Sequence, residues 1–138
     1  MKKLINDDAT YKIIGCAMRV HSKLGCGFQE RIYQKALAME MKKVDLKYHR
    51  EMEMDLVYDG MKIGTRRVDF FVEDRIMLEL KAVVKLEDVH LSQAINYCEA
   101  SSLPLGLLIN FGSKSLEYKR VINTTHPENI PKSNNPSI

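Results

Sequence analysis

The order of apolar and polar positions along the chain alternates between two periods. Apolar residues three and four apart, which predict amphipathic helices, recur in three stretches. Strict alternation and short apolar runs, which predict strands, occupy most of the remaining chain, and turn residues such as Asp59-Gly60 separate them. We therefore expect helices over residues 6–24, 29–43 and 89–101, and strands over 47–58, 61–72, 76–84, 103–111 and 116–122.

Residues 68–82 form a predicted hairpin on which the candidate chemistry depends. Two apolar runs flank the loop at 73–75, and Asp69, Glu79 and Lys81 interrupt those runs with charge. A three-residue loop sets Asp69 directly opposite Glu79 on one face of the sheet, and Lys81 follows two residues later on that face. A two-residue turn would shift the register by one and separate the two carboxylates.

Two carboxylates that lie opposite each other repel, so their pairing requires a compensating cation. Mg²⁺ prefers oxygen ligands and keeps several waters, and the Leu80 carbonyl lies between the two acidic positions as a further ligand. Lys81 is placed to hold or deprotonate a metal-bound water, or to stabilise charge on a phosphate. This layout indicates metal-assisted hydrolysis of a phosphodiester. The alternative is a half-exposed hairpin in which Glu79 and Lys81 form ordinary cross-strand ion pairs.

Further polar residues lie near this hairpin in the sequence or in the predicted fold. Arg66 and Arg67 come just before Asp69, where they either contact phosphate beside the metal or lie at a solvated strand end. On the predicted third helix, one polar-tipped stripe either points at the end of the hairpin or forms a half-covered helix edge. Its members are His90, Gln93 and Tyr97.

The second half of the chain predicts the fold class. The run over 103–111 is almost continuously apolar, as in a strand buried on both faces, and with the preceding strand and helix it predicts a βαβ unit. We therefore expect an α/β (α+β) fold with a mixed central sheet flanked by helices on both faces. Prolines, Asn and Ser dominate after Asn123, so we expect one domain over residues 1–123 and a flexible tail over 124–138.

Composition narrows the picture only in part. A chain of 138 residues with 45% hydrophobic and 28% charged residues is typical of one soluble globular domain. The net charge of +3 permits a nucleic-acid partner without arguing for one. The three cysteines form no Cys-x-x-Cys pair, which favours buried thiols in a reducing cytoplasm over a zinc site or a disulfide frame. No apolar stretch is long enough to span a membrane, so we expect a cytoplasmic protein without a membrane partner.

Several motifs in one order resemble a known family. The stretch Gly27-Phe28-Gln29-Glu30-Arg31-Ile32-Tyr33 looks like the signature of the GxxExxY protein family, a branch of the PD-(D/E)XK nuclease superfamily. The resemblance runs from about Tyr11 to Asn123, and Cys26 stands where a proline is expected between two glycines. The other matching stretches are Val20-His21-Ser22-Lys23-Leu24-Gly25, Glu79-Leu80-Lys81-Ala82, His90-Leu91-Ser92-Gln93 with Tyr97, and Gly106-Leu107-Leu108-Ile109-Asn110-Phe111-Gly112.

The resemblance implies a restriction-endonuclease-like core and a set of site residues. In the superfamily pattern, Asp69 and Glu79 are metal ligands and Lys81 is the catalytic lysine. Glu30 matches a helix carboxylate that some of these nucleases direct at the metal. The residues that match the Gln-x-x-x-Tyr of RecB-type nucleases, which support the site or contact DNA, are Gln93 and Tyr97.

Together, the residues and the resemblance predict a nuclease that depends on Mg²⁺ or Mn²⁺ and hydrolyses nucleic acid, DNA rather than RNA. One alternative is a nucleic-acid-binding or scaffold protein that has lost catalysis on a nuclease fold, which the small size of the chain favours. A further alternative is a subunit that works only as a homodimer or beside a partner. The expected ligands are Asp69, Glu79, the Leu80 carbonyl and Glu30; the expected catalytic residues are Asp69, Glu79, Lys81, Gln93 and Tyr97; and the expected nucleic-acid contacts are Arg66, Arg67 and His90.

Overall fold

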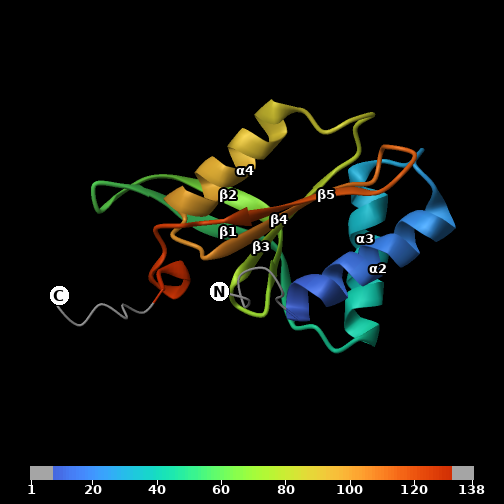
Figure 1. The fold of residues 1–138 in the computed structure, drawn as a ribbon, viewed down its shortest axis with the longest axis horizontal. Coiled ribbons are helices and arrows are strands. Elements are labelled where there is room, and N and C mark those ends of the chain that lie inside the picture. The colour runs from blue at the N-terminus through green and yellow to red at the C-terminus, as the bar shows by residue number, and fades with distance from the viewer. Residues whose placement is uncertain (1–7, 132–138) are drawn as a thin grey trace.

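Figure 1 shows the fold in a computed structural model, which describes residues 8–131. The predicted helices and strands all form, with bounds within a few residues of those expected, and the first two residues of the expected helix over 6–24 lie outside the described residues. The helices are α2 (Asp8–Leu24), α3 (Glu30–Lys43), α4 (Asp88–Ala100) and the 3₁₀ helix η1 (Pro127–Asn129). The strands are β1 (Tyr48–Tyr58), β2 (Met61–Val72), β3 (Ile76–Lys81), β4 (Leu105–Asn110) and β5 (Glu117–Ile122).

The five strands form one mixed sheet in the order β1-β2-β3-β4-β5. Neighbouring strands pair antiparallel except β3 and β4, which pair parallel and are connected through α4. β4 is buried along its whole length, which explains why its sequence is almost continuously apolar. The predicted mixed sheet and its βαβ unit are therefore confirmed.

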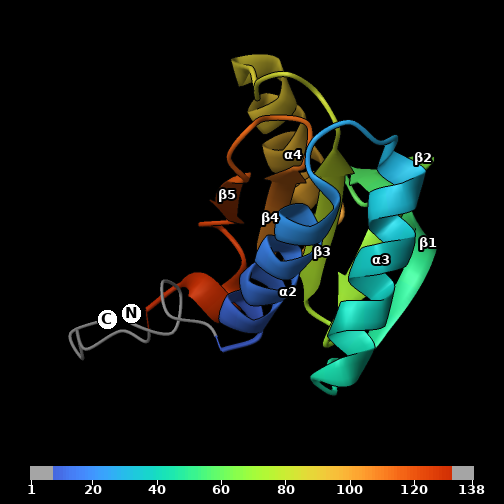
Figure 2. The same cartoon turned by 90° about the vertical axis from the view of Figure 1, so that its right-hand side faces the viewer.

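Helices cover both faces of this sheet. Figure 2 shows α2 and α3 in front of the strands and α4 behind them. The larger apolar cluster joins α2 and α3 to one face and includes Ile13 and Phe70. The smaller cluster joins α4 to the opposite face and includes Val68 and Cys98. The fold is thus an α+β sandwich of three layers, as expected for a restriction-endonuclease-like core.

Helix α3 packs a different stripe from the expected one. The periodicity predicts an apolar stripe of Ile32, Ala36 and Met39 with Tyr33, Leu37 and Met41 near it. The exposed fractions of Ile32 and Met39 are instead 40% and 64%. The buried stripe instead contains Tyr33, Leu37 and Met41, each with no exposed surface. A shift of one residue turns a helix by about 100°, and the large Tyr33 ring sets the orientation by occupying the core.

No helix within residues 8–131 has the length and apolar character needed to cross a membrane.

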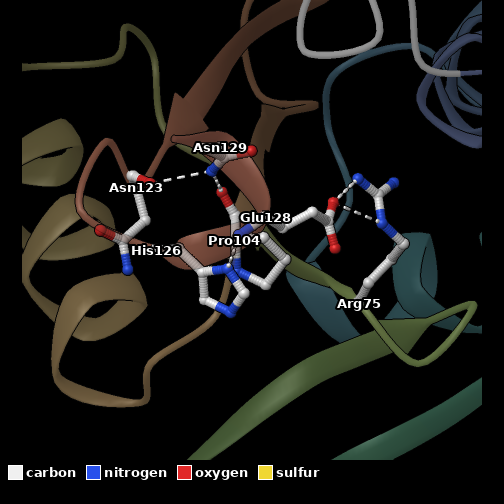
Figure 3. Close-up of polar contacts among 6 residues, drawn as sticks. All are labelled: Arg75, Pro104, Asn123, His126, Glu128 and Asn129. Carbon is white, nitrogen blue, oxygen red and sulfur yellow. Dashed lines mark hydrogen bonds and ion pairs between the residues drawn. The ribbon is translucent and has the colours of Figure 1, made fainter. Parts of the chain in front are cut away.

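The segment after β5 packs on the domain through polar contacts, which Figure 3 shows. The side-chain amide of Asn129 donates to the backbone carbonyls of Pro104 and Asn123, at 2.6 and 2.8 Å. Asn129 is accordingly only 6% exposed. Arg75, in the turn between β2 and β3, pairs with Glu128 on η1. These contacts attach η1 both to the start of β4 and to the β2–β3 turn.

The structure differs here from the expected flexible tail over 124–138. Within residues 124–131, Asn129 is buried against the domain, and the backbone N–H of Glu128 donates to Nδ1 of His126 at 3.0 Å to start η1. Residues 132–138 lie outside the described part of the chain.

Candidate active site

The turn between β2 and β3 has the predicted length. Two of the three loop residues, which lie within 73–75, adopt left-handed backbone with φ of 54° and 56°, so the chain reverses tightly. The ladder beyond the loop pairs Phe70 with Leu78. This is the register of a three-residue loop, and it makes Asp69 and Glu79 the next positions along the two strands.

The two strands part at these acids instead of continuing their ladder. Backbone pairing ends at Phe70 and Leu78, and Oδ2 of Asp69 accepts a hydrogen bond from the backbone N–H of Leu80 at 2.8 Å. A carboxylate oxygen therefore serves as the acceptor for a strand amide. It lies close enough to Glu79 for the charge of Asp69 to raise the pKa of that residue.

A distortion of β1 and β2 accounts for the position of Asp69. The two strands pair on both sides of Glu51 and Asp69 but not at these residues, and Glu51 has a left-handed φ of 51°. Val68 packs on the α4 face of the sheet and Phe70 on the α2–α3 face, although residues two apart in a regular strand share a face. The alternation is thus broken at Asp69, although the register of the two strands is the same on both sides of the break.

A buried glutamine, which the sequence analysis missed, holds the other oxygen of Asp69. Nε2 of Gln34 on α3 donates to Oδ1 of Asp69 at 3.0 Å, and Nη2 of Arg50 on β1 donates to Oε1 of Gln34 at 2.8 Å. Gln34 is 5% exposed. The one sequence signal for it is its spacing of four residues from Glu30, which puts both polar residues on one face of the helix.

Glu79, the second member of the acid pair, is 6% exposed. Nη2 of Arg66 lies 2.8 Å from its Oε2, and the guanidinium carbon of Arg66 lies 3.9 Å from the centre of the Tyr97 ring on α4. Burial raises the pKa of Glu79 to about 7; the charge of Asp69 adds to the rise and the charge of Arg66 opposes it. Tyr97 therefore contacts the site through Arg66.

Lys81 ends β3, two residues after Glu79. Leu78 and Leu80 pack in the α2–α3 cluster and Met77 in the α4 cluster, so the pleat directs Glu79 and Lys81 together towards the α4 face. Lys81 is half-buried, and its ammonium has no hydrogen-bond or ion-pair partner within residues 8–131. The amine is therefore available to a substrate or to water.

The backbone that follows Lys81 is fixed from β4. Oδ1 of the fully buried Asn110 accepts from the backbone N–H of Val83 at 2.9 Å, and its Nδ2 donates to the Val83 carbonyl and to Oε1 of Glu117, both at 2.9 Å. The hydrogen bond from Asn110 holds the pKa of Glu117 below its ordinary value. A Cβ atom on Gly112 would lie 2.4 Å from the backbone nitrogen of Val83, so only glycine fits there.

Glu30 reaches the site from the start of α3. The hydroxyl of Tyr33 donates to the carbonyl of Gly25 and accepts from the backbone N–H of Phe28, which fixes the loop before the helix. The Tyr33 ring also stacks on Phe111 with 4.7 Å between ring centres. The helix start then opens onto a pocket of about 390 Å³ beside Asp69. Its lining residues are Glu30, Arg31, Gln34, Glu51 and Asp69.

Three of the predicted residues make no contact with the acid pair among the described residues. Arg67 is exposed and lies opposite Glu53 in the β1–β2 ladder. Nδ1 of His90 accepts a hydrogen bond from the backbone N–H of Glu87 at 2.9 Å at the start of α4. Gln93 is exposed on the same helix.

The acid pair suits a hard cation in its chemistry. No three His, Cys, Asp or Glu side chains within residues 8–131 are grouped to hold a metal, and the acid pair supplies two carboxylates side by side. Oε2 of Glu79 is buried and, among the described residues, has no aligned hydrogen-bond partner, since the 2.8 Å contact with Arg66 is an ion pair of poor hydrogen-bond geometry. Two carboxylates with positions left for water are typical of Mg²⁺ sites.

The comparisons with known proteins agree with this geometry. The PD-(D/E)XK nuclease superfamily matches residues 7–121. No curated protein matches the chain. Among solved structures, the crystal structure of SSO0001 has a TM-score of 0.54 and 19% sequence identity, and the match covers 67% of this chain but 50% of that one. This likeness shows the fold. Because the superfamily match spans most of the chain, the protein belongs to the PD-(D/E)XK nuclease superfamily.

Proposed function

We propose that the protein is a nuclease that depends on Mg²⁺ or Mn²⁺ and hydrolyses phosphodiester bonds in nucleic acid, DNA rather than RNA. The observation that carries the proposal is the acid pair of half-buried Asp69 and buried Glu79, with Lys81 on the same strand and face as Glu79. Nucleases of this superfamily generally use divalent metals, and the superfamily implies a nucleic-acid substrate. The positions of Gly27, Glu30 and Tyr33 support membership of the GxxExxY branch.

Asp69 and Glu79 would hold the metal, together with the Leu80 carbonyl and Glu30. The Leu80 carbonyl is supported as a ligand because the N–H of the same residue already donates to Asp69. Glu30 is supported as a ligand because it lines one pocket with Asp69. A bound divalent ion would supply positive charge for the developing phosphorane and lower the pKa of its water. Gln34 holds one oxygen of Asp69 in place while this happens.

Lys81 would position the attacking water or stabilise charge on the phosphate through its unpaired ammonium. Tyr97 braces Arg66, and Gln93 lies one turn earlier on the same helix face. Arg66, Arg67 and His90 would contact phosphates of the substrate. The side chain of Arg66 is 27% exposed, so it reaches both Glu79 and the surface.

A second candidate function is a nucleic-acid-binding or scaffold protein without catalysis. The contact of Arg66 with Glu79 favours it, because a guanidinium already neutralises the carboxylate that would bind the metal. Steeply salt-dependent binding without cleavage at any metal would select this function. A homodimer is a further proposal, which light scattering tests. The free thiols Cys16, Cys26 and Cys98 support a cytoplasmic location.

The test is cleavage of labelled single-stranded DNA, duplex DNA and RNA in Mg²⁺, Mn²⁺ or chelator. The expected result is metal-dependent cleavage of DNA that falls by at least about 100-fold in Glu79→Ala and in Lys81→Met. The exposed Lys85→Met serves as the matched control and should keep full activity. Cleavage that survives both active-site substitutions would end this proposal.

A further inference from the structure

Arg66 occupies an unusual position between the acid pair and the surface. Its guanidinium lies 2.8 Å from the buried Oε2 of Glu79 and stacks 3.9 Å above the ring of Tyr97. The ring faces the guanidinium plane, so it holds the group without using any of its N–H donors. A stacked guanidinium can turn on such a platform while the ring stays in place.

The contact leaves polar atoms unused on both partners. Within residues 8–131, Nε of Arg66 and Oε2 of Glu79 are buried and have no aligned hydrogen-bond partner. The pair of Arg19 and Glu40 elsewhere in the molecule is different, because Nε of Arg19 donates to Oε1 at 3.1 Å and Lys43 binds Oε2 at 3.2 Å. A pair that serves only to stabilise the fold would be expected to use its donors in this way.

The unused atoms point to two missing ligands of opposite charge. A buried carboxylate oxygen without a hydrogen bond can bind a cation, and a buried guanidinium N–H without an acceptor can donate to an anionic oxygen. Glu79 also lies beside Asp69, whose negative charge repels its own. Arg66 supplies one positive charge where the acid pair carries two negative charges when both are ionised, so the neutralisation is incomplete.

We infer that Arg66 is an exchangeable counter-cation. It forms an ion pair with Glu79 in the metal-free protein and moves to a phosphate of the nucleic-acid backbone when a divalent cation binds the acid pair. This inference rests on the proposed function and adds regulation of its site. The cation and the guanidinium compete for Glu79, and the released guanidinium gains an anionic partner. Metal binding and phosphodiester binding are therefore positively coupled through Arg66, and by linkage each strengthens the other equally.

The first experiment measures Mn²⁺ affinity by isothermal titration calorimetry at about pH 8, above the pKa of about 7 for Glu79. Arg66→Met removes the competitor, and we expect Mn²⁺ to bind about fivefold more tightly, the factor that matches the upper range for a partly exposed ion pair. Arg67→Met removes an equal charge from the next position and should leave the affinity within twofold, roughly. An unchanged or weaker affinity in Arg66→Met would overturn the inference.

The second experiment measures binding of a short DNA duplex by fluorescence anisotropy, in the Lys81→Met background so that the duplex is not cleaved. Mn²⁺ should tighten binding more in this background than in the same variant that also carries Arg66→Met. Equal tightening in both proteins would show that Arg66 carries no coupling.

A third measurement needs no variant of Arg66 and so does not depend on its folding. In ¹⁵N-labelled wild-type protein, Mg²⁺ should shift the Nε–Hε resonance of Arg66, and an unmoved resonance at saturating Mg²⁺ would contradict exchange. Failure of the proposed function has a different signature, because wild-type protein and Glu79→Gln would then bind Mn²⁺ equally poorly. Mn²⁺ binding and cleavage by wild-type protein, with no effect of Arg66→Met on affinity, would remove only the inference.

Discussion

Asp69 and Glu79 lie at the same parting of two strands but in different surroundings. Asp69 accepts a hydrogen bond on each oxygen, from Gln34 and from the Leu80 amide, and these bonds fix the orientation of its carboxylate. Glu79 has instead a guanidinium beside it and little exposed surface, and burial raises its pKa to about 7. The removal of a neighbour should therefore affect the two residues differently.

The pKa of Glu79 predicts the sign of a pH effect on stability. Its ordinary value is 4.5 and its folded value is about 7, so between these pH values the folded state holds a proton that the unfolded chain has released. The free energy of unfolding should therefore fall as pH rises through this window, by about 3 kcal/mol. Urea denaturation across the window measures it. Glu79→Gln should lose the dependence, and the exposed Glu99→Gln should keep it.

Gln34 should matter for metal affinity although it is not a ligand. Gln34→Leu removes the hydrogen bond that orients Asp69, so we expect Mn²⁺ to bind about tenfold more weakly, as when partners of metal ligands are removed elsewhere. The neighbouring exposed Lys35→Leu is the matched control on the same helix. Calorimetric affinities that change equally in the two variants would show that Gln34 has no specific role.

The sequence singles out the two acids and the lysine as candidates, but it does not single out Gln34 or Arg50. Asp69, Glu79 and Lys81 stand out because each interrupts an apolar run. Gln34 contacts Arg50 and Asp69 across separations of 16 and 35 residues, and no local pattern reports such a contact. The role of Arg66 was likewise visible only as a choice between phosphate contact and a solvated strand end.

At the level of elements, the length of the loop at 73–75 predicted the register of β2 and β3. The break in alternation at Asp69 depends instead on how the two faces of the sheet pack. The loop at 73–75 fixes which residues of β2 and β3 face each other, and the structure has that register. The break at Asp69 was not predictable, because Val68 and Phe70 are both apolar and form an unbroken pattern while packing on opposite faces. The left-handed backbone at Glu51 was not predictable either, because glycine is the residue that usually signals such a conformation and Glu51 is not a glycine.

Gly112 tests how tightly the end of β4 holds the backbone after β3. Gly112→Ala would place a Cβ 2.4 Å from backbone atoms of Val83, which cannot move as a side chain would. We expect the free energy of unfolding to fall by about 2–3 kcal/mol. Gly27→Ala, where no atom lies within 4 Å of the new Cβ, is the matched control and should change it little. Urea denaturation of both variants makes the comparison, and equal losses would contradict the close packing at Val83.

For the whole molecule, the order of elements was enough to predict three layers, but not the end of the chain. Parallel and antiparallel pairing meet at β3, and helices from both layers support the acids: α3 through Gln34 and α4 through Tyr97. The proline-rich sequence after Asn123 is typical of a flexible segment. It packs as far as Asn129 because the side-chain amide of that residue donates to two backbone carbonyls, and a sequence pattern does not reveal such acceptors.

Asn129→Ala should weaken the whole fold because it leaves the carbonyls of Pro104 and Asn123 without this donor. We expect a loss of about 1–3 kcal/mol in the free energy of unfolding. Asn96→Ala on the exposed side of α4 is the control and should cause no loss. Chemical denaturation of the two variants checks the prediction, and an unchanged midpoint in Asn129→Ala would show that η1 does not contribute to the stability of the domain.

The unequal size of the two apolar clusters has a consequence for motion. α4 is anchored mainly through Ala94 and Cys98, with Val89 56% and Ile95 37% exposed, whereas α2 and α3 share the larger cluster. Local opening should therefore begin at α4, and amide hydrogen exchange should be faster there than in α3. Such local opening would carry Tyr97 away from the sheet while Gln34 stays in place. The surroundings of Glu79 would then become mobile, whereas Asp69 would keep its hydrogen bond from Gln34.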